Sequence, residues 1–378
     1  MKISTPLSFD VHDANLENYL AALPTTSGVY VLQIAGNHPH LGSSANLPRR
    51  LKRLFAPSSA GSGSIIGRLR ANLARIDCWP TGSKLENSLV LYELARLYFA
   101  EDYIRRLRLR MPWFVGLASD DPFARLAVVN RVSQNSGAFL GPFPSRDAAQ
   151  LYEQETSGLF QIRRCTERLA PHSEHPGCIY GEMNQCLRPC QCAVTAQEYA
   201  SEVARVGEFL STNGRSTLAV LSAARDRACD ETEFEQAAGI HKRIEKVKAA
   251  TAARDQVITE IDLFNGVALT RAAQAGHFQL WPMLQGYWQE PVLLDFRPGE
   301  PRTKSLDQEL RERLESALSI QNVKRKRTED LAIFSRWYFS SWRDGEWFPF
   351  TTLAHLNYRR LVREISKMSR SVPENGVF

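Results

Sequence analysis

Four cysteines constrain this chain more than any other feature, because they fall within 26 residues of a 378-residue sequence. Cys165, Cys178, Cys186 and Cys190 are separated by 12, 7 and 3 residues. Thiolates this crowded need disulfide pairing or a soft metal to neutralise them. Four thiolates suit a tetrahedral zinc ion as well as an iron–sulfur cluster. The spacing therefore predicts a metal or cluster site without choosing between the two.

The rest of the sequence indicates where such a site would operate. It contains no run of 18 apolar residues, and its amino terminus has no apolar core of signal-peptide length. We therefore expect no membrane span and a cytoplasmic location. Because cytoplasmic thiols are kept reduced, this expectation favours metal ligation over disulfides.

Basic residues gather in short clusters, although 47 basic against 41 acidic residues give a net charge of only +6. The clusters lie at residues 49–53, 105–110, 324–327 and 359–363. A single cluster is typical of a solvated helix face. Four of them favour a polyanionic partner, because gathered Lys and Arg are the footprint of phosphate contacts.

Length and apolar periodicity predict a multi-domain α+β protein. A strand at 28–33 precedes a basic helix at 47–55. Two helices, at 195–212 and 215–253, are separated by the stop signal Asn213-Gly214. Beyond residue 257, short strands alternate with Gly and Pro turns. The predicted domains are a small sheet with helices at 1–115, linker strands and the four-cysteine segment at 116–194, a helical hairpin at 195–256, and a mixed carboxy-terminal domain of unknown role at 257–378.

Three further motifs accompany the cysteines along the chain. Gly28-Val29-Tyr30 and His40-Leu41-Gly42, followed by the basic helix, resemble the two halves of the GIY-YIG nuclease signature. Phe234-Glu235-Gln236-Ala237-Ala238 follows the cysteines. In this order the motifs resemble those of the UvrC and Cho-like excinuclease family, over roughly residues 20 to 250. The resemblance implies that residues 1–115 form a GIY-YIG nuclease-like domain.

Nucleases of the GIY-YIG kind need a proton acceptor near the attacking water, a carboxylate for a divalent metal, and a fixed positive charge at the phosphate. By resemblance, Tyr30 is the first catalytic tyrosine, His40 replaces the second, and Arg50 is the catalytic arginine. The metal-binding glutamate aligns with Tyr92, which leaves its neighbour Glu93 as the candidate ligand. One step along a helix rotates a side chain by about 100°, so Glu93 and Tyr92 point in different directions.

These replacements predict a degenerate GIY-YIG site that is impaired in cleavage. The alternative is an active Cho-like endonuclease that nicks damaged DNA with Mg²⁺ or Mn²⁺. In that alternative His40 is the general base, and Glu93 or Glu86 is the metal ligand. In both, basic side chains would bind DNA. The expected DNA-binding residues are Arg49, Arg50, Arg53, Arg105 and Arg106.

The resemblance also implies a [4Fe-4S] cluster on the four cysteines, with zinc as the alternative. The helix that begins near Phe234 resembles the UVR motif that engages a UvrB-type helicase. Its partner-binding residues would be Phe234, Ala237, Ala238 and Arg243, although such an apolar stripe is equally typical of core packing. We therefore expect a DNA-binding, UvrC-related protein of nucleotide-excision repair or DNA processing. A third reading is a scaffold that recruits a UvrB-type partner without close DNA contact.

Overall fold

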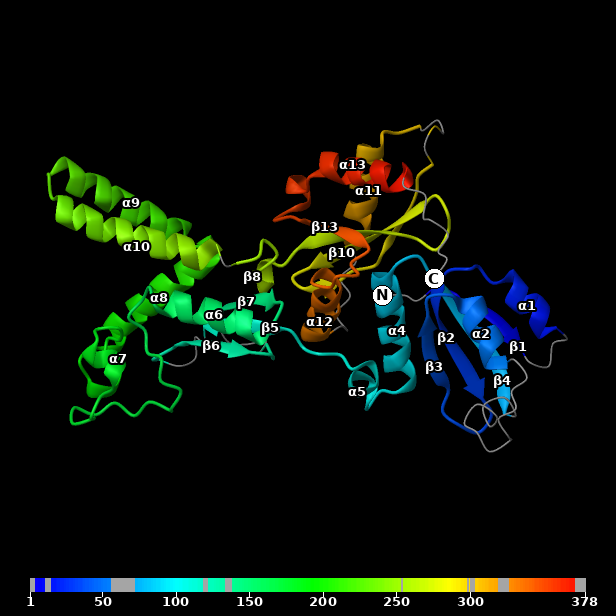
Figure 1. The fold of residues 1–378 in the computed structure, drawn as a ribbon, viewed down its shortest axis with the longest axis horizontal. Coiled ribbons are helices and arrows are strands. Elements are labelled where there is room, and N and C mark those ends of the chain that lie inside the picture. Colours follow the sequence, from blue (N-terminus) through cyan, green and yellow to red (C-terminus); the bar gives the residue numbers. More distant parts are fainter. Residues whose placement is uncertain are drawn as a thin grey trace. The chain divides into compact units, whose positions relative to one another are not determined.

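The computed structural model describes residues 4–10, 15–55, 72–117, 122–132, 138–252, 254–297, 299, 303–318 and 326–370. The chain forms two compact units, one of Met1–Arg110 with Asn265–Phe378 and the other of Met111–Phe264. Both combine helices with antiparallel sheets, which confirms the predicted multi-domain α+β class (Figure 1). No helix within the described ranges has the length and apolar character needed to cross a membrane.

The amino-terminal half of the first unit is built on a four-stranded sheet with the strand order β1-β4-β2-β3. The strands are β1 (Leu7–Asp10), β2 (Ser27–Ile34), β3 (His40–Ser44) and β4 (Leu73–Thr81). The helices beside it are α1 (Leu16–Ala22), α2 (Leu47–Phe55), α4 (Lys84–Tyr98) and α5 (Tyr103–Leu107). The strand predicted at 28–33 and the basic helix predicted at 47–55 are both present, as β2 and α2.

Side-chain alternation along β2 decides which helices cover which face of this sheet. Tyr30 lies on the face where Leu51 of α2 joins the core. Val31, one residue further along, points to the other face and packs with Val90 and Leu94 of α4. Helices α2 and α4 therefore cover opposite faces of the sheet.

The carboxy-terminal half of the first unit holds a second antiparallel sheet, with the path β11-β10-β9-β13 and with β12 beside β10. Its strands are β9 (Gly266–Arg271), β10 (His277–Leu284), β11 (Tyr287–Trp288), β12 (Val292–Asp295) and β13 (Gly345–Pro349). Its helices are α11 (Leu306–Leu318), α12 (Arg327–Tyr338) and α13 (Tyr358–Arg370). Leu280 of the sheet shares a buried core with Leu310 of α11 and Leu361 of α13.

Helix α12 joins the two halves of the first unit by packing against α4. The Glu329 carboxylate at the start of α12 is buried and accepts a hydrogen bond of 2.5 Å from the Tyr92 hydroxyl of α4. The Tyr103 hydroxyl donates to both oxygens of the same carboxylate, at 2.8 and 2.9 Å. Lys326 Nζ lies 3.2 Å from that hydroxyl. This polar cluster ties residues that are more than two hundred positions apart.

The second unit contains a small antiparallel sheet with the strand order β6-β5-β7-β8 and a set of helices. The strands are β5 (Trp113–Leu117), β6 (Leu126–Val129), β7 (Ala138–Phe143) and β8 (Thr259–Glu260). The helices are α6 (Arg146–Ser157), α7 (Ile179–Glu182), α8 (Ala196–Thr212), α9 (Arg215–Asp230) and α10 (Phe234–Ala252). The four cysteines lie between α6 and α8.

The predicted hairpin is divided differently from the expectation. The stop at Asn213 and Gly214 is present, with φ values of 52° and 74° in the left-handed region. The single helix expected over 215–253 is wrong, because it breaks into α9 and α10, which pack on each other as an antiparallel pair (Figure 1). Thr232, with φ of 62°, ends α9, and the Glu233 amide donates to the Ala228 carbonyl at 2.8 Å. This is the hydrogen bond that closes a helix end of the Schellman type.

Candidate functional site

Three of the four predicted catalytic side chains come together on one face of the first sheet. Arg50 Nε donates a 3.2 Å hydrogen bond to the Tyr30 hydroxyl, and Tyr30 is 1% exposed. The His40 ring lies beside Tyr30 with 6.2 Å between the ring centroids. Burial, and secondarily the charge of Arg50, lowers the pKa of His40. A neutral imidazole next to a tyrosine is suited to accept a proton.

Residue Glu93, the fourth, is engaged elsewhere. It lies on α4, which covers the opposite face of the sheet, and its carboxylate is 3.7 Å from Arg96 of the same helix. Glu86, the alternative ligand, accepts a 2.7 Å hydrogen bond from the Gly82 amide at the start of α4. Burial raises the pKa of Glu86 to about 7. The metal ligand expected from the sequence therefore stays a prediction, and both candidate carboxylates have local partners.

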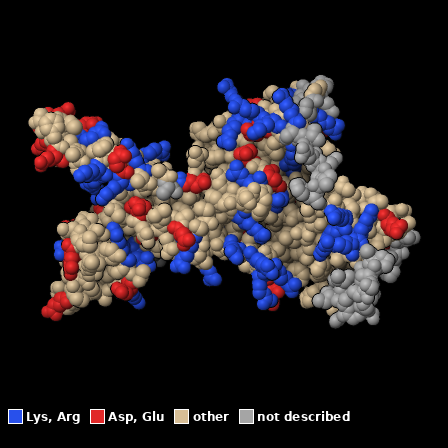
Figure 2. Space-filling view, in the orientation of Figure 1, with Lys and Arg blue, Asp and Glu red and all other residues tan. Residues whose placement is uncertain are grey.

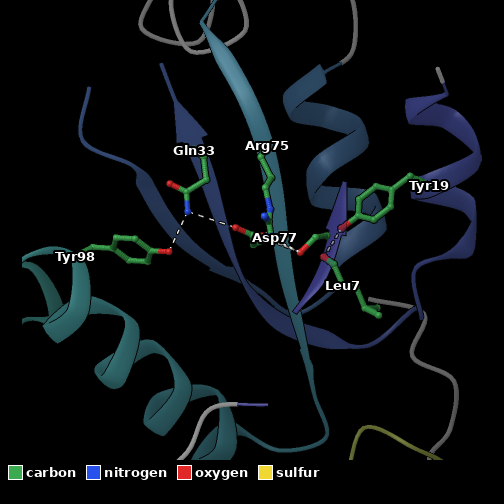
Figure 3. A network of polar contacts seen from close by, with 7 residues as sticks. Leu7, Tyr19, Gln33, Arg75, Asp77 and Tyr98 are labelled. Carbon is green, nitrogen blue, oxygen red and sulfur yellow. Dashed lines mark hydrogen bonds and ion pairs between the residues drawn. The ribbon is translucent and has the colours of Figure 1, made fainter. Parts of the chain in front are cut away.

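A buried carboxylate that the sequence pattern did not reveal holds the sheet together on the α4 side. Asp77 of β4 accepts hydrogen bonds from Ser8 Oγ and Arg75 Nε, both at 2.7 Å, and from Gln33 Nε2 at 3.3 Å (Figure 3). Gln33 also donates to the Tyr98 hydroxyl of α4 at 2.9 Å. The only indication of this role in the sequence is the position of an acidic residue within the largely apolar strand β4. Because every partner is internal, Asp77 has a structural role.

The basic side chains predicted to bind DNA differ in how far their charge is offset. Arg49 and Arg53 are exposed on α2, which contains no acidic residue. Arg105 and Arg106 are exposed on α5, but Asp102 accepts hydrogen bonds from both, at 3.2 and 2.9 Å. Those bonds, chiefly the one from Arg106, lower the pKa of Asp102. Helix α2 itself contributes no acid beside its cations, and Figure 2 shows Lys and Arg side chains gathered over it.

The four cysteines are free thiols that lie near one another in the second unit. Burial raises the pKa of Cys186, and the neighbouring thiols Cys178, Cys165 and Cys190 raise it further, against a hydrogen bond from the Arg188 amide that lowers it. That amide is 3.4 Å from the Cys186 sulfur. Within the described ranges no three His, Cys, Asp or Glu side chains are arranged as ready metal ligands.

The buried Arg163 fastens the start of the cysteine segment. Its Nε donates to the Phe123 carbonyl at 2.6 Å and its Nη1 to the Glu167 carbonyl at 2.9 Å. The same Nη1 lies 3.8 Å from the Cys165 sulfur. Arg163 is only 5% exposed, so its guanidinium stabilises the segment from the interior. A buried side chain of this kind is not available for contact with DNA.

The predicted partner-binding residues lie on two sides of α10. Phe234 is 70% exposed, and Ala238 and Arg243 are also exposed. Ala237 is buried, as is Ile244, on the side of α10 that packs against α9. The apolar stripe predicted from the sequence therefore divides into residues that pack against α9 and residues that are exposed to solvent.

Comparison with known proteins gives the chain its relatives. The family described as UvrC/Cho excinuclease, middle domain, matches residues 112–209. UvrABC system protein C of Nitratidesulfovibrio vulgaris is 26% identical over 291 residues, which are 73% of this chain and 42% of that protein. The protein of the same name from Lacticaseibacillus casei is 27% identical over 67% of this chain and 41% of its own length. The aligned part of the chain spans about two fifths of these relatives. No solved structure matches the chain.

Proposed function

We propose, on the premise that the chain belongs to the UvrC/Cho-like family, that it is a DNA-binding protein of nucleotide-excision repair with impaired GIY-YIG cleavage. One observation carries the proposal. Arg50 and Tyr30, which the resemblance assigns to the catalytic site, are hydrogen-bonded to each other. Tyr92, which aligns with the metal-binding glutamate of the family, is bonded instead to Glu329. Without a carboxylate at this position, a divalent cation would lack the protein ligand that normally holds it beside the substrate phosphates.

A nicking assay tests this proposal. Labelled lesion-bearing and branched duplexes are incubated with Mg²⁺ or Mn²⁺ and either the wild type or Tyr30→Phe. We expect both proteins to bind duplex with an affinity that falls steeply as salt rises, and neither to nick it. Arg50→Ala should weaken binding. Nicking by the wild type that Tyr30→Phe abolishes would replace the proposal with that of an active endonuclease.

The active endonuclease is the second candidate, and His40 is the observation that favours it. Its lowered pKa keeps the imidazole neutral near pH 7, and its ring lies beside Tyr30. A neutral imidazole in this place can take a proton from an attacking water. If nicking is seen, His40→Gln should abolish it, whereas Glu93→Gln and Glu86→Gln separate the two possible metal ligands.

We also propose that the four cysteines hold an iron–sulfur cluster, with zinc as the alternative. The chemistry of the donor set fits either group, because Cys165, Cys178 and Cys190 lie close enough to influence the Cys186 thiol, and Cys186 and Cys190 are buried. The bound group would cross-link the segment that lies between α6 and α8, where secondary structure is sparse. The cysteines would hold it as thiolates, and the backbone amide of Arg188 would stabilise the charge on Cys186.

Metal analysis of anaerobically purified protein tests the cysteine site. We expect bound iron with sulfide, or zinc, in the wild type and in the control Cys229→Ser, whose thiol is exposed on α9. Cys186→Ser should lose that metal and melt at a lower temperature, because metal binding contributes to folding. A metal-free wild type, or a Cys186→Ser protein with full metal content, would contradict the assignment.

The exposed side of α10 is the surface we propose for a UvrB-type partner. Phe234 offers a large, exposed aromatic anchor. Arg243, nine residues further along α10, points to the other side of the helix, so Phe234 carries this proposal. Phe234→Ala should weaken binding of a UvrB-type protein by about tenfold or more without changing the melting temperature, because the side chain is exposed. Val220→Ala, which removes another exposed apolar side chain from the hairpin, is the control. Equal affinities of the two variants would exclude this surface.

A further inference from the structure

We propose that helix α13 of the carboxy-terminal half contacts the sugar–phosphate backbone of nucleic acid. The α13 basic face consists of Arg359, Arg360, Arg363, Lys367 and Arg370, all of them exposed. The inference rests on the proposed DNA-binding function and extends it to residues 265–378. Figure 2 shows Lys and Arg side chains gathered over α13 and its neighbour α11.

Helical spacing brings the α13 basic face onto one side of the helix. At about 100° per residue, its five members fall within an arc of about 100° and span about 16 Å of the helix axis. The opposite side carries Tyr358, Leu361 and Ile365, all buried in the core that α13 shares with the second sheet. Packing therefore fixes α13 with its cations toward solvent.

Among the residues that the structure describes, most of this positive charge is not offset. No acidic residue in the described part of the chain forms an ion pair with Arg359, Arg363 or Arg370. Arg360 reaches Glu346 only at 3.8 Å, and Lys367 lies 3.3 Å from Glu364 of the same helix. A row of three uncompensated guanidiniums attracts a polyanion.

Three of the four acidic residues of the neighbouring helix α11 have basic partners nearby, and the fourth, Glu315, interacts with Arg311 and Tyr358. Asp307 pairs with Arg311 at 2.8 Å, Glu309 with Arg313 at 2.7 Å, and Glu312 with Lys304 at 2.6 Å. Arg311 also lies over the Tyr358 ring, 3.8 Å from its centroid, where α11 meets α13. Most of the acidic charge on α11 is thus already paired with a basic residue of α11 or with Lys304.

The buried apolar side decides between the two common polyanionic partners of a basic helix. A membrane-binding helix inserts its apolar face into the lipid boundary. In α13 that face belongs to the protein core, so only the charged side is available. A helix that offers only its charged side can still bind duplex DNA, which carries one negative charge per about 1.7 Å of its axis. Arginine side chains contact these phosphates on the outside of the duplex.

Salt-dependent binding of a labelled duplex tests the α13 basic face in the full chain. Arg359→Gln/Arg363→Gln should bind about tenfold more weakly than the wild type, with a log–log salt slope smaller by about 2. Arg359→Lys/Arg363→Lys keeps the charge and should keep the slope. The matched control Arg225→Gln/Lys248→Gln removes two cations already paired with Asp226 and Glu245, and should bind as the wild type does.

The outcomes separate this inference from the proposed function. If the wild type fails to bind duplex, both fail together. If Arg49→Gln/Arg53→Gln weakens binding and the α13 variant does not, the function stands and this inference is overturned. Binding of the wild type to phosphatidylglycerol vesicles, lost in the α13 variant while duplex binding is unchanged, would also overturn it. If Arg359→Gln/Arg363→Gln melts at a lower temperature than the wild type, Arg370→Gln is tested in its place. Its log–log salt slope should be smaller than that of the wild type by about 1.

Discussion

At the scale of single residues, the Tyr30 site depends on a glycine in the neighbouring strand. Gly42 of β3 faces Tyr30 of β2 in the strand register. A Cβ at this position would lie 2.5 Å from the Tyr30 ring and from its hydroxyl. The glycine lets the ring lie across β3 and reach Arg50. The glycine of the second motif is thus required by packing around the tyrosine of the first.

Gly42→Ala should displace Tyr30 and break its hydrogen bond with Arg50. We expect the free energy of unfolding to fall by about 1–3 kcal/mol, the usual cost of overpacking a core, as measured by urea denaturation. Gly239→Ala is the control, because a Cβ there meets no atom within 4 Å. In the middle of α10 it should be neutral or stabilise by up to about 1 kcal/mol. Equal effects of the two changes would argue against the observed packing of Tyr30.

At the scale of the element, α4 begins with a reciprocal cap that uses Glu86, the alternative candidate for the metal ligand. The Ser83 hydroxyl accepts a hydrogen bond from the Glu86 amide at 3.0 Å, and the Glu86 carboxylate accepts one from the Gly82 amide. The carboxylate is largely buried, and burial raises its pKa to about 7. Its charge is therefore costly to the fold at neutral pH.

Glu86→Gln should change how stability depends on pH. A carboxyl whose pKa is about 7 in the folded state and 4.5 in the unfolded state binds its proton more tightly when folded. Between these values, rising pH therefore lowers the free energy of unfolding of the wild type relative to the variant. Urea titrations of both proteins from pH 4.5 to 7.5 measure the difference. A difference that is independent of pH would show that Glu86 ionises normally.

At the scale of the whole molecule, the first unit joins the two ends of the chain through α4 and α12. Tyr92, which the sequence motifs align with the metal ligand of the resembling family, donates its hydroxyl proton to Glu329. Desolvation, and then the hydrogen bond with Glu329, raises the pKa of Tyr92 well above its ordinary value, so the phenol stays protonated and donates. The residue at that aligned position thus links α4 to α12.

A double-mutant cycle with Tyr92→Phe and Glu329→Gln tests this attachment. Each single change should lower the free energy of unfolding. Tyr92→Phe removes a hydrogen-bond donor from the buried Glu329 carboxylate, and Glu329→Gln removes the carboxylate that accepts from Tyr92. The two should be non-additive by about 0.5–3 kcal/mol in denaturation measurements. Tyr92→Phe combined with the distant Lys248→Gln should be additive. Additivity in the first pair would mean that the hydroxyl and the carboxylate do not interact.

Much of the local structure follows from local patterns. The strand around Tyr30, the basic helix α2, the stop at Asn213 and the strands beyond residue 257 depend on alternation, helical spacing and turn residues that lie close together in sequence. The break at Thr232 was missed, because α9 and α10 continue one helical pattern across it. The partners of Glu86, Glu93 and Asp77 were equally invisible, since a carboxylate has no sequence signal for the donor it finds.

By itself, the sequence determined the α+β class, the four gathered cysteines, and the order of motifs that resembles the UvrC/Cho-like family. These depend on residue type and spacing, which a chain carries before it folds. Only the tertiary structure decided that Arg50 meets Tyr30, that α4 lies on the other face of the sheet, and that Glu329 binds Tyr92 across 237 positions. Such contacts are set by the packing of distant elements, because burial leaves each polar group only the partners that the fold brings to it.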